Sequence, residues 1–537
     1  MRLPTALAPL RHPAFRLIWL ANLVANTGMW MQNTGAGWLM TSLAPSPIMV
    51  SMVQVAALLP VFLLALPAGA LADILDRRLY LIAGQAWIAL AGAILAVLTL
   101  SSAIGPWSLI ALTFAIGAGT AMNSPAWGAT TPETVPRQDL AQAIVLNGIG
   151  FNLTRAVGPA LGGVVVAAFG PQVNFALNAV AFCVAILCLI AWRRTEPPRA
   201  LPKEHFLSAM RAGIGFVRAS PVLRSCVVRG LVFFGFGAAI WGLLPLLVRK
   251  QLGLGPEWFG LLLGAMGAGA VCAGFVLPSL RGRLDRGATV TGACLLGGAA
   301  LVLLGQSGHW SVALVAMLAY GVAWISGASS LQASTQLASP SWVRARALGI
   351  YQLATFGGLA GGAALGGWAG EALGLPIALG LAGIACALGG LGTHRFAIEV
   401  APFGPLPEKA VPTPRLEPAD PAMAEALATE RNRVLEAVRY VIDPANRQAF
   451  LAAMAECRGV RLRGGALSWL LYENVAHPER WVELWTVESW TAHLREDSRL
   501  TEGDRAILAR AAALHRGDGP PEAARYLNVM PDIALTL

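Results

Sequence analysis

The sequence predicts an all-α membrane domain of twelve transmembrane helices in two six-helix halves, followed by a small α+β domain with a ferredoxin-like pattern. Three observations lead to this fold class: the composition, the length of the apolar runs and the distribution of charge between them. Of the 537 residues, 56% are hydrophobic and 13% are charged, whereas a soluble domain has about 25% charged residues. This amount of charge is too small to cover a water-soluble particle of this length, so most of the chain is expected in a lipid bilayer.

The first 400 residues contain twelve apolar runs long enough to cross a bilayer as helices, which takes about 20 residues. The runs are continuous and do not alternate with polar residues, as the strands of a membrane β-barrel would. Helices also satisfy their own backbone hydrogen bonds in lipid. The predicted spans are residues 16–40, 48–72, 79–101, 107–128, 141–169, 172–192, 222–248, 257–280, 288–306, 309–330, 345–369 and 373–393.

The connectors between these runs alternate in charge. One set, which includes both ends of the membrane domain, holds 19 Lys and Arg residues, and the alternate set holds two, Arg249 and Lys250. Because cytoplasmic connectors carry the excess of basic residues, both termini are predicted in the cytoplasm, with the chain in the inner (plasma) membrane. The same rule explains the net charge of +10 without a nucleic-acid partner. The N-terminus runs directly into the first span and is expected to be retained, not cleaved as a signal peptide.

Changes in composition divide the chain into five segments. Two six-helix bundles cover residues 1–195 and 222–396, and the basic residues 196–221 form a cytoplasmic linker between them. Residues 397–430 are rich in proline and are expected to form an extended spacer. Residues 431–537 then form a soluble domain.

The two bundles are related by an internal repeat. Residues 135–163 align without gaps to residues 339–367, with an offset of 204 that pairs Gly158 with Gly362. Transporters built from parallel repeats have their substrate site between the halves, near the middle of the membrane, and the halves rock around it. The repeat therefore predicts a central site reached by alternating access.

Two stretches of the membrane domain resemble the major facilitator superfamily. The loop from Gly69 through Asp73 to Asp76, Arg77 and Arg78 is similar to the signature loop of that superfamily. A second stretch resembles its secretion-effector branch, which is akin to enterobactin and macrolide exporters, and this stretch contains Gly117, Pro125, Pro132, Glu133, Asn147, Asn152, Arg155, Gly158, Pro159, Gly162 and Gly163. The resemblance covers nearly the whole chain. It implies a major facilitator fold and export of a small amphipathic molecule, siderophore-like or drug-like, coupled to a proton.

The sequence departs from the family pattern at two places. Thr113 stands where many exporters of the family carry an arginine in the fourth span, and Gly282 stands where the second half would repeat Asp73. In the loop itself, Asp73 is expected to pair with Arg77 and Arg78 across the cytoplasmic face, as part of a gate that opens when the halves rock. The alternative is that Asp73 only caps the following helix.

The polar residues inside the spans are the candidates for the transport cavity. A charged side chain in a span is costly and usually faces a cavity or a partner, so Arg155 is predicted to line the cavity together with Asn26, Asn33 and Asn147. The alternatives are that Arg155 extends to the membrane interface and that the asparagines form hydrogen bonds between helices. For Arg229 both interpretations stay open. No carboxylate lies in the middle of a span, so proton coupling rests on the resemblance alone.

A row of small residues follows Arg155 in the fifth span. Gly158, Pro159, Gly162 and Gly163 are predicted to form a packing motif, because glycines let helices approach closely and proline permits a bend. Contact with a ligand is the less favoured alternative.

The tail reads as strand, helix, strand, strand, helix, strand, which is the ferredoxin-like pattern. It resembles the dimeric α/β barrel of antibiotic-biosynthesis monooxygenases, and this resemblance implies self-association. Trp490 and His493 form a Trp-x-x-His element and are a candidate pocket for a flat ligand. The favoured alternative is that the tryptophans form the core and His493 is an ordinary helix residue. None of the seven cysteines forms a metal-binding pair, so neither a metal nor a cofactor is expected.

Together these features predict a secondary active exporter and not an enzyme. The sequence contains no phosphate-binding loop, so ATP is not the direct energy source. The alternative is a membrane-anchored enzyme or receptor whose tail binds or modifies the ligand. The identity of the substrate, the coupling ion and the direction of transport stay open at this point.

Overall fold

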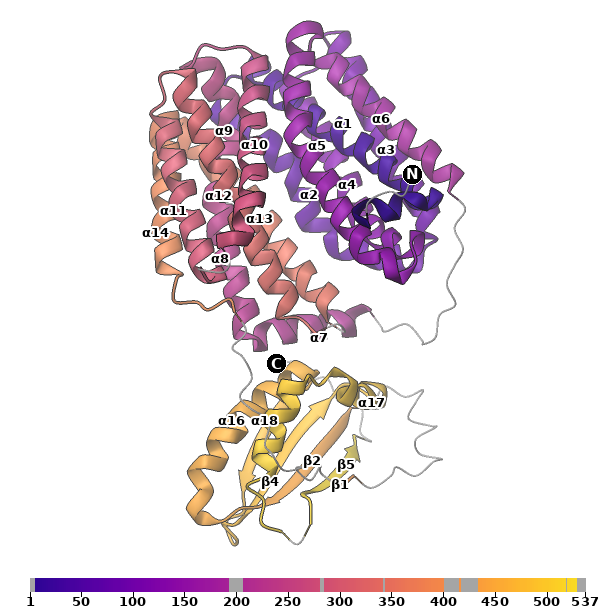
Figure 1. Ribbon diagram of the computed structural model, residues 1–537, viewed down its shortest axis with the longest axis vertical. Helices are drawn as coiled ribbons and strands as arrows, with labels where there is room; N and C mark the ends of the chain where they lie inside the picture. Colours follow the sequence, from indigo (N-terminus) through magenta and orange to yellow (C-terminus); the bar gives the residue numbers. More distant parts are fainter. Residues whose placement is uncertain are drawn as a thin grey trace. The chain divides into compact units, whose positions relative to one another are not determined.

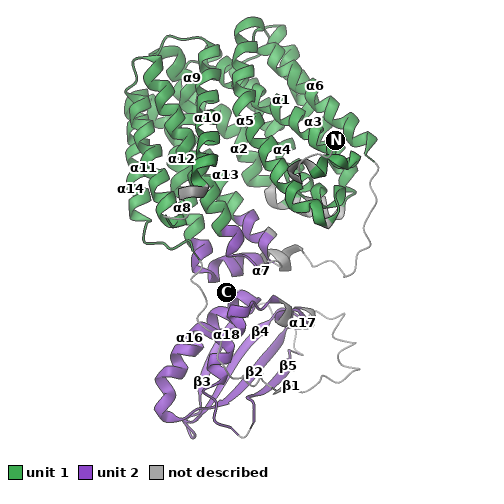
Figure 2. Ribbon diagram, viewed as in Figure 1, with its two compact units in different colours: residues 1–202, 225–334, 351–399 green, residues 203–224, 335–350, 400–537 purple. Residues whose placement is uncertain are grey.

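The computed structural model describes residues 5–192, 206–280, 284–340, 343–399, 415–416, 433–517 and 519–528. The chain forms two compact units (Figure 2). The first contains residues 1–202, 225–334 and 351–399, and the second contains residues 203–224, 335–350 and 400–537. The first unit holds most of the helical bundle, and the second holds the tail.

The N-terminal half consists of long helices that mostly begin at a proline. They are α1 (Pro13–Leu43), α2 (Pro47–Ile74), α3 (Arg77–Leu100), α4 (Pro106–Thr134), α5 (Leu140–Phe169) and α6 (Pro171–Ala191), with short 3-10 segments at Thr5–Arg11 and Arg137–Asp139. Proline is well placed at the first position of a helix because its missing N–H has no partner there anyway. Helix α3 instead begins after Asp76, whose side chain accepts a hydrogen bond of 2.9 Å from the backbone N–H of Leu79.

The C-terminal half repeats this arrangement and forms a second bundle (Figure 1). Its elements are α8 (Pro221–Gly237), α9 (Ala239–Leu246), the π-helical segment η3 (Leu247–Gln251), α10 (Pro256–Leu280), α11 (Arg286–Gly305), α12 (Trp310–Leu337), α13 (Arg344–Leu373) and α14 (Leu375–Gly392). Helix α11 begins after Asp285, whose side chain accepts from the backbone N–H of Ala288. Asp285 therefore caps α11 as Asp76 caps α3.

The structure confirms the internal repeat. Helix α13 begins and ends 204 residues after α5 does, and α14 begins 204 residues after α6. The turns that precede α6 and α14 also match, because Gly170 and Gly374 have φ values of 82° and 86°. This left-handed conformation favours glycine.

Eleven helices in the described part of the chain are long and apolar enough to cross a membrane. The prediction of twelve spans adds α1, which has 31 residues and packs against α5 and α6. Its four amide side chains, Asn22, Asn26, Gln32 and Asn33, lower its mean hydropathy. The seventh predicted span is interrupted at Ala238, between α8 and α9.

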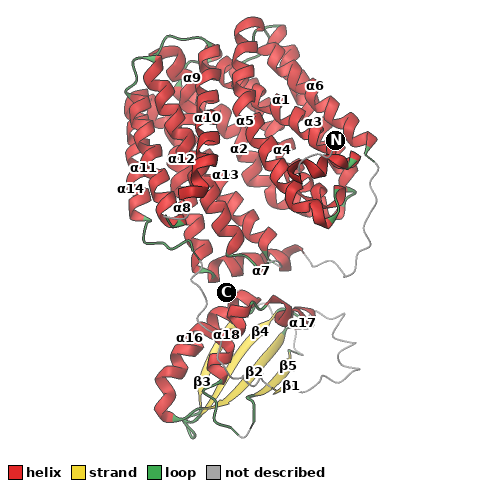
Figure 3. Ribbon diagram, viewed as in Figure 1, coloured by secondary structure: helices red, strands yellow, loops and turns green. Residues whose placement is uncertain are grey.

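The tail has the predicted order of strands and helices, with two helices in the second helical position. Its elements are β2 (Val434–Val441), α16 (Arg447–Gly464), β3 (Ser468–Glu473), β4 (Arg480–Val487), α17 (Trp490–Arg499), α18 (Glu502–Ala512) and β5 (Glu522–Leu527). Four antiparallel strands lie in the order β5-β2-β4-β3, and β1 (Arg415–Leu416) pairs in parallel with β5 at the edge (Figure 3). Helix α7 (Phe206–Ala219) belongs to the same compact unit.

One face of the tail sheet is covered by helices and forms the core. Because side chains alternate between the two faces of a strand, this face collects the buried residues of β2 and β4, which pack on α16. The core consists of Val434, Val438, Tyr440, Phe450, Met454, Cys457, Trp481, Trp485, Val487 and Trp490, among others. Two carboxylates, Glu436 and Glu483, lie buried on this face as well.

Candidate functional site

The predicted cavity residue Arg155 lies in the middle of α5 and is surrounded by three tryptophans. Its guanidinium carbon is 5.9 Å from the ring centroids of Trp30 and Trp241 and 5.1 Å from that of Trp324. These distances are within the range of cation–π attraction. Trp30 comes from α1, Trp241 from α9 and Trp324 from α12, so the two halves of the bundle meet around Arg155.

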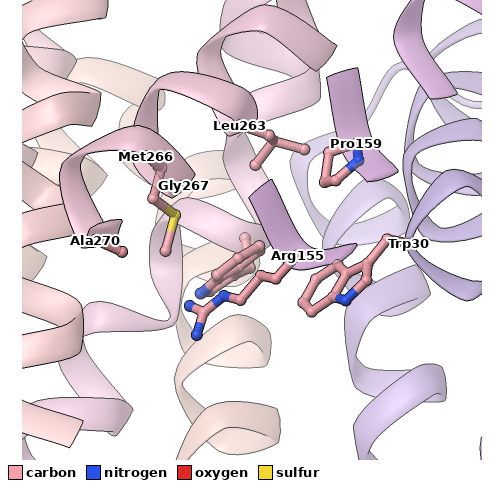
Figure 4. Close-up of a pocket in the computed structure, with 8 residues that line it drawn as sticks. Trp30, Arg155, Pro159, Leu263, Met266, Gly267 and Ala270 are labelled. Atoms are coloured by element: carbon pink, nitrogen blue, oxygen red, sulfur yellow. The ribbon is translucent and has the colours of Figure 1, made fainter. Parts of the chain in front are cut away.

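A small pocket opens beside this cluster. Figure 4 shows the Arg155 side chain reaching into it between Trp30 and the segment of α10 that carries Met266 and Ala270. Among the residues that the structure describes, no carboxylate pairs with the Arg155 guanidinium, and no hydrogen bond is formed by it. The buried indole N–H of Trp241 has no partner either. The pocket therefore offers one unpaired positive charge and one free N–H donor among aromatic faces.

Arg229, on α8 of the second half, is a buried arginine whose guanidinium is held by hydrogen bonds. Its side chain is among the largest fully buried ones, with 1% of the residue exposed. Nη2 donates to the carbonyl oxygen of Gly287 at 2.6 Å and to Oγ1 of Thr291 at 2.7 Å, and Nη1 donates to the carbonyl oxygen of Phe396 at 3.3 Å. Arg229 therefore ties α8 to α11 and to the end of the second half. Two of these partners lie at helix ends, because Gly287 is in the first turn of α11 and Phe396 follows the end of α14.

The predicted asparagines do not line the pocket around Arg155. Nδ2 of Asn26 donates to the backbone oxygen and Oδ1 of Asn22, at 2.8 and 2.7 Å. Nδ2 of Asn147 donates to Oγ1 of Thr131 on α4 at 2.9 Å. Asn33 is half-buried on α1. Asn26 thus forms hydrogen bonds within its own helix, and Asn147 forms one between helices, which is the alternative to lining the cavity.

Sequence reasoning missed the tryptophans that surround Arg155. A usable signal was present, because tryptophan is enriched at the membrane interfaces, whereas Trp30, Trp241 and Trp324 lie inside helices. What the sequence does not show is that three different helices bring them to one arginine.

The glycine row of α5 lies at close approaches to neighbouring helices. A Cβ atom at Gly158 would come within 2.6 Å of Cβ of Trp30, and one at Gly163 within 2.8 Å of Cα of Gly260 on α10. A Cβ at Gly162 would lie 2.9 Å from Cα of Met31, while Pro159 lines the Arg155 pocket. The contact of Gly163 with Gly260 joins the two halves. The three glycines therefore lie at helix contacts, as a packing motif would, whereas Pro159 lines the pocket.

The basic residues of the motif loop bind neighbours in their own half. Arg77 forms an ion pair with Glu133 of α4. Arg78 donates through Nε to the carbonyl oxygen of Leu189 at 2.8 Å. The expected pairing through Asp73 and the role of Gly69 fall on residues whose side chains lie outside the described part of the structure. The gate at this loop therefore stays a prediction.

At the opposite end of the bundle, hydrogen bonds join the two halves. We call this the Ser46 end, and it comprises residues 41–46, Arg249, Lys250 and Glu371. Nη1 of Arg249 donates to Oγ1 of Thr41 at 2.9 Å, and Nζ of Lys250 donates to the carbonyl oxygen of Pro45 at 2.6 Å. Oγ of Ser46 donates to Oε2 of Glu371 at 2.5 Å. The two basic residues of this connector set thus help to hold the halves together here.

In the tail, the two predicted pocket residues lie side by side. The rings of Trp490 and His493 are 5.0 Å apart. Nδ1 of His493 is 2.5 Å from Oε1 of Glu436 and 3.6 Å from Oε2 of Glu496. Burial raises the pKa of Glu436 to about 7. Burial alone would lower the pKa of His493, but its hydrogen bonds to the two carboxylates outweigh burial and raise that pKa to about 9.

The fold defines the class of protein. Two repeated helical halves that meet around a buried charge are the architecture of a multi-pass membrane transporter of the major facilitator type. Solved structures agree at the level of the fold. A POT family transporter in complex with 5-aminolevulinic acid matches 70% of this chain and 94% of its own, with a TM-score of 0.59 and 11% identity. A bacterial homologue of the lysosomal transporter Spinster, inward-facing and unoccupied, matches 74% and 95%, with a TM-score of 0.51 and 15% identity.

The sequence profile of the transmembrane secretion effector family matches residues 4–531, so the chain belongs to this family. It is similar to the enterobactin exporter EntS of Escherichia coli, with 27% identity over 378 residues, which are 68% of this chain and 87% of the exporter. It is also similar to the staphyloferrin A transporter of Staphylococcus aureus, with 27% identity over 256 residues, which are 47% of this chain and 64% of that transporter.

Proposed function

We propose that this chain is a secondary active exporter of a small amphipathic anion, which it moves by alternating access of its two halves. The observation that carries the proposal is the unpaired guanidinium of Arg155 among three indole rings. A charged side chain in the middle of a membrane helix costs several kcal/mol unless it is paired. Arg229 of the second half forms three hydrogen bonds, whereas the guanidinium of Arg155 has none within the described residues and is available to a ligand.

The pocket chemistry indicates the class of cargo. The guanidinium recognises a carboxylate or another oxyanion, by charge and by paired N–H donors. The indole faces suit an aromatic or apolar body, and the free N–H of Trp241 suits an acceptor on it. The relatives are named for enterobactin and staphyloferrin A, which supports a siderophore-like cargo, with a drug-like anion as the other member of this class.

The contacts at the Ser46 end support the alternating movement. At this end the halves are joined by hydrogen bonds from the side chains of Arg249, Lys250 and Ser46, which a rocking motion can break. We place this end outside the cell, because its connectors lack the basic excess of the cytoplasmic side. Twelve spans in the plasma membrane with both termini in the cytoplasm complete this topology. Proton coupling is part of the proposal on the resemblance alone.

The tail is proposed as a separate domain that self-associates and does not carry the transport path. Its sheet leaves Leu470, Tyr472 and Tyr526 exposed, and apolar side chains of this kind favour association. The boundaries at 397–430 and 431–537 are proposed on the change in composition. The alternative is that the tail modifies the cargo. Activity of the isolated tail on the exported molecule would support this alternative.

The experiment that tests the export function has two steps. Metabolite profiling of a deletion strain, inside and outside the cell, identifies a molecule that accumulates inside when the chain is absent. Flux of that molecule is then measured in proteoliposomes with wild type, Arg155→Gln and, as a control, Arg16→Gln at an exposed position of α1. The proposal expects flux with wild type and with the Arg16→Gln control, and loss of flux with Arg155→Gln. Equal flux with all three would refute the assignment of the site, and no flux with wild type would refute the function.

A further inference from the structure

Three side chains that bear metal-ligating atoms converge inside the tail. They are Glu436 on β2 and His493 and Glu496 on α17, and their ligand atoms all lie within 4.8 Å of one another. The side chains are nearly buried, with 6%, 10% and 14% of their surface exposed for Glu436, His493 and Glu496. A surface cluster of acidic residues would instead be solvated on all sides.

Local structure explains why the three groups meet. Glu436 alternates with Val434 and Val438 on the helix-covered face of β2, so its carboxylate points into the domain. His493 and Glu496 are three residues apart on α17, a spacing that places two side chains on the same face of a helix. One strand and one helix thus supply three different donors: two carboxylate oxygens and one imidazole nitrogen.

The charge balance of this cluster differs from that of the other interior carboxylate of the tail. Glu483 is 0% exposed and accepts from Nε of Arg461 at 3.1 Å, from Nε1 of Trp469 at 2.9 Å and from the hydroxyl of Tyr440 at 3.1 Å. Its charge is fully compensated by one arginine and two neutral donors. Glu436 and Glu496, by contrast, share the single imidazole of His493.

One arginine on the neighbouring strand, Arg525, does not pair with these carboxylates. Arg525 lies opposite Glu436 in the register of β2 and β5. Its guanidinium carbon is 5.7 Å from the ring of Trp490, and its buried Nε has no hydrogen-bond partner. Within the described tail, Arg525 forms no ion pair with Glu436 or Glu496. Two nearly buried carboxylates therefore share one imidazole, and a bound cation would compensate the second negative charge.

We propose that Glu436, His493 and Glu496 bind a divalent first-row transition-metal ion such as Zn²⁺ or Mn²⁺. Imidazole nitrogen with carboxylate oxygen is a donor set that these ions accept. With metal–ligand distances of about 2.1 Å, donor atoms lie about 3.0–3.4 Å apart. The distances from Nδ1 of His493 to Glu436 and Glu496, 2.5 and 3.6 Å, bracket this range, so small side-chain rotations suffice. Three protein ligands leave positions for water or for a chelating molecule.

The groups around the cluster hold its donors in place. Nε1 of Trp485 donates to Oε1 of Glu496 at 2.9 Å, which leaves Oε2 free toward His493. Trp490 lies against the His493 ring at 5.0 Å and restricts its rotation. Such outer contacts orient metal ligands, and their loss typically weakens metal affinity by about 10- to 100-fold.

Metal binding is tested on the full chain in detergent, purified with a tag that contains no histidine. We expect one equivalent of Zn²⁺ per chain in a competition titration, and Co²⁺ should give visible absorption bands of a nitrogen- and oxygen-ligated ion. Glu496→Gln and His493→Gln should each weaken the affinity for Zn²⁺ by at least about 100-fold, and Trp485→Phe by about 10- to 100-fold. The control is His477→Gln, since His477 is an exposed tail histidine 3.6 Å from a carboxylate oxygen of Glu479, and it should bind as wild type does.

Melting of the tail distinguishes a variant that has lost a metal ligand from one that no longer folds. Each variant is compared without metal first, and only variants that melt cooperatively in that state enter the titration. Addition of Zn²⁺ should then raise the melting temperature of wild type and of the control, but not that of Glu496→Gln. The proposal is overturned if wild type binds less than about one tenth of an equivalent, or if Zn²⁺ binds Glu496→Gln and His493→Gln as tightly as wild type.

Discussion

Arg155 and Arg229 are both arginines inside membrane helices, and the structure predicts opposite effects when each is replaced by methionine. Arg155 forms no hydrogen bond within the described residues, and its guanidinium lies over three indole rings. Arg229 forms three hydrogen bonds to groups of the second half. Methionine keeps the length of the side chain and removes the charge, so the pair of variants isolates what each charge contributes.

For Arg155, removal of the charge regains about 2.5–3.5 kcal/mol of the cost of an arginine at the centre of a membrane helix. Three ring contacts near the outer limit of 6 Å contribute about 0.5 kcal/mol each, or about 1.5 kcal/mol in total. The free energy of unfolding of Arg155→Met should therefore rise by about 1–2 kcal/mol. At about 2–4 °C per kcal/mol this is an increase of roughly 2–8 °C in melting temperature. Transport should decrease by about 10- to 150-fold, since a hydrogen bond to a charged group contributes about 1.5–3 kcal/mol.

For Arg229, the same regain of about 2.5–3.5 kcal/mol is opposed by three lost hydrogen bonds of about 1.5–3 kcal/mol each. Arg229→Met should lower the free energy of unfolding by about 1–6.5 kcal/mol. Melting of the purified variants in one detergent, followed by tryptophan fluorescence, measures both changes. Flux in proteoliposomes measures transport. A decrease in melting temperature for Arg155→Met, or unchanged flux with it, would show that Arg155 is a structural residue and would refute the reasoning.

Three further predictions concern topology, movement and the tail. Reporter fusions at Ala401 and near Ser46 should give opposite signals if the Ser46 end faces the outside, and matching signals would rule out the proposed topology. Arg249→Ala removes two hydrogen bonds of a charged group between the halves, to Thr41 and Ser42, worth about 1.5–3 kcal/mol each. Spin labels across the Ser46 end should therefore show a larger population of long distances, and an unchanged distribution would mean that these contacts do not bias the movement. Glu483→Gln should destabilise the tail by about 3–5 kcal/mol, because it leaves a buried arginine uncompensated. The measurement is urea unfolding of fragment 425–537, which should be soluble, cooperative and self-associating, and failure of the unmodified fragment to fold would count against an independent domain.

Much of the helical architecture follows from local patterns that the sequence carries. Continuous apolar runs place helices in lipid because every backbone group must be satisfied within the segment. The repeat is visible because the glycines at 158, 162 and 163 of α5 recur at 362, 366 and 367 of α13, and the structure confirms it from the common offset of helix ends. The order of strands and helices in the tail follows equally from alternation and turn residues. Only α1 departs from the simple hydropathy pattern, because its amides make it more polar than the other spans.

Which residues come together at each site could be seen only in the tertiary structure. Arg155 was evident as a costly charge, but Trp30, Trp241 and Trp324 come from three helices spread over nearly 300 residues, and no local pattern relates them. Similarly, Glu436 lies 57 residues before His493, so the sequence showed Trp490 and His493 without the carboxylates that give the histidine its environment. The periodicity of helices and strands is set by the local backbone and is therefore visible along the sequence. A site, by contrast, forms where elements distant in the sequence pack together, and this packing depends on burial of the whole core.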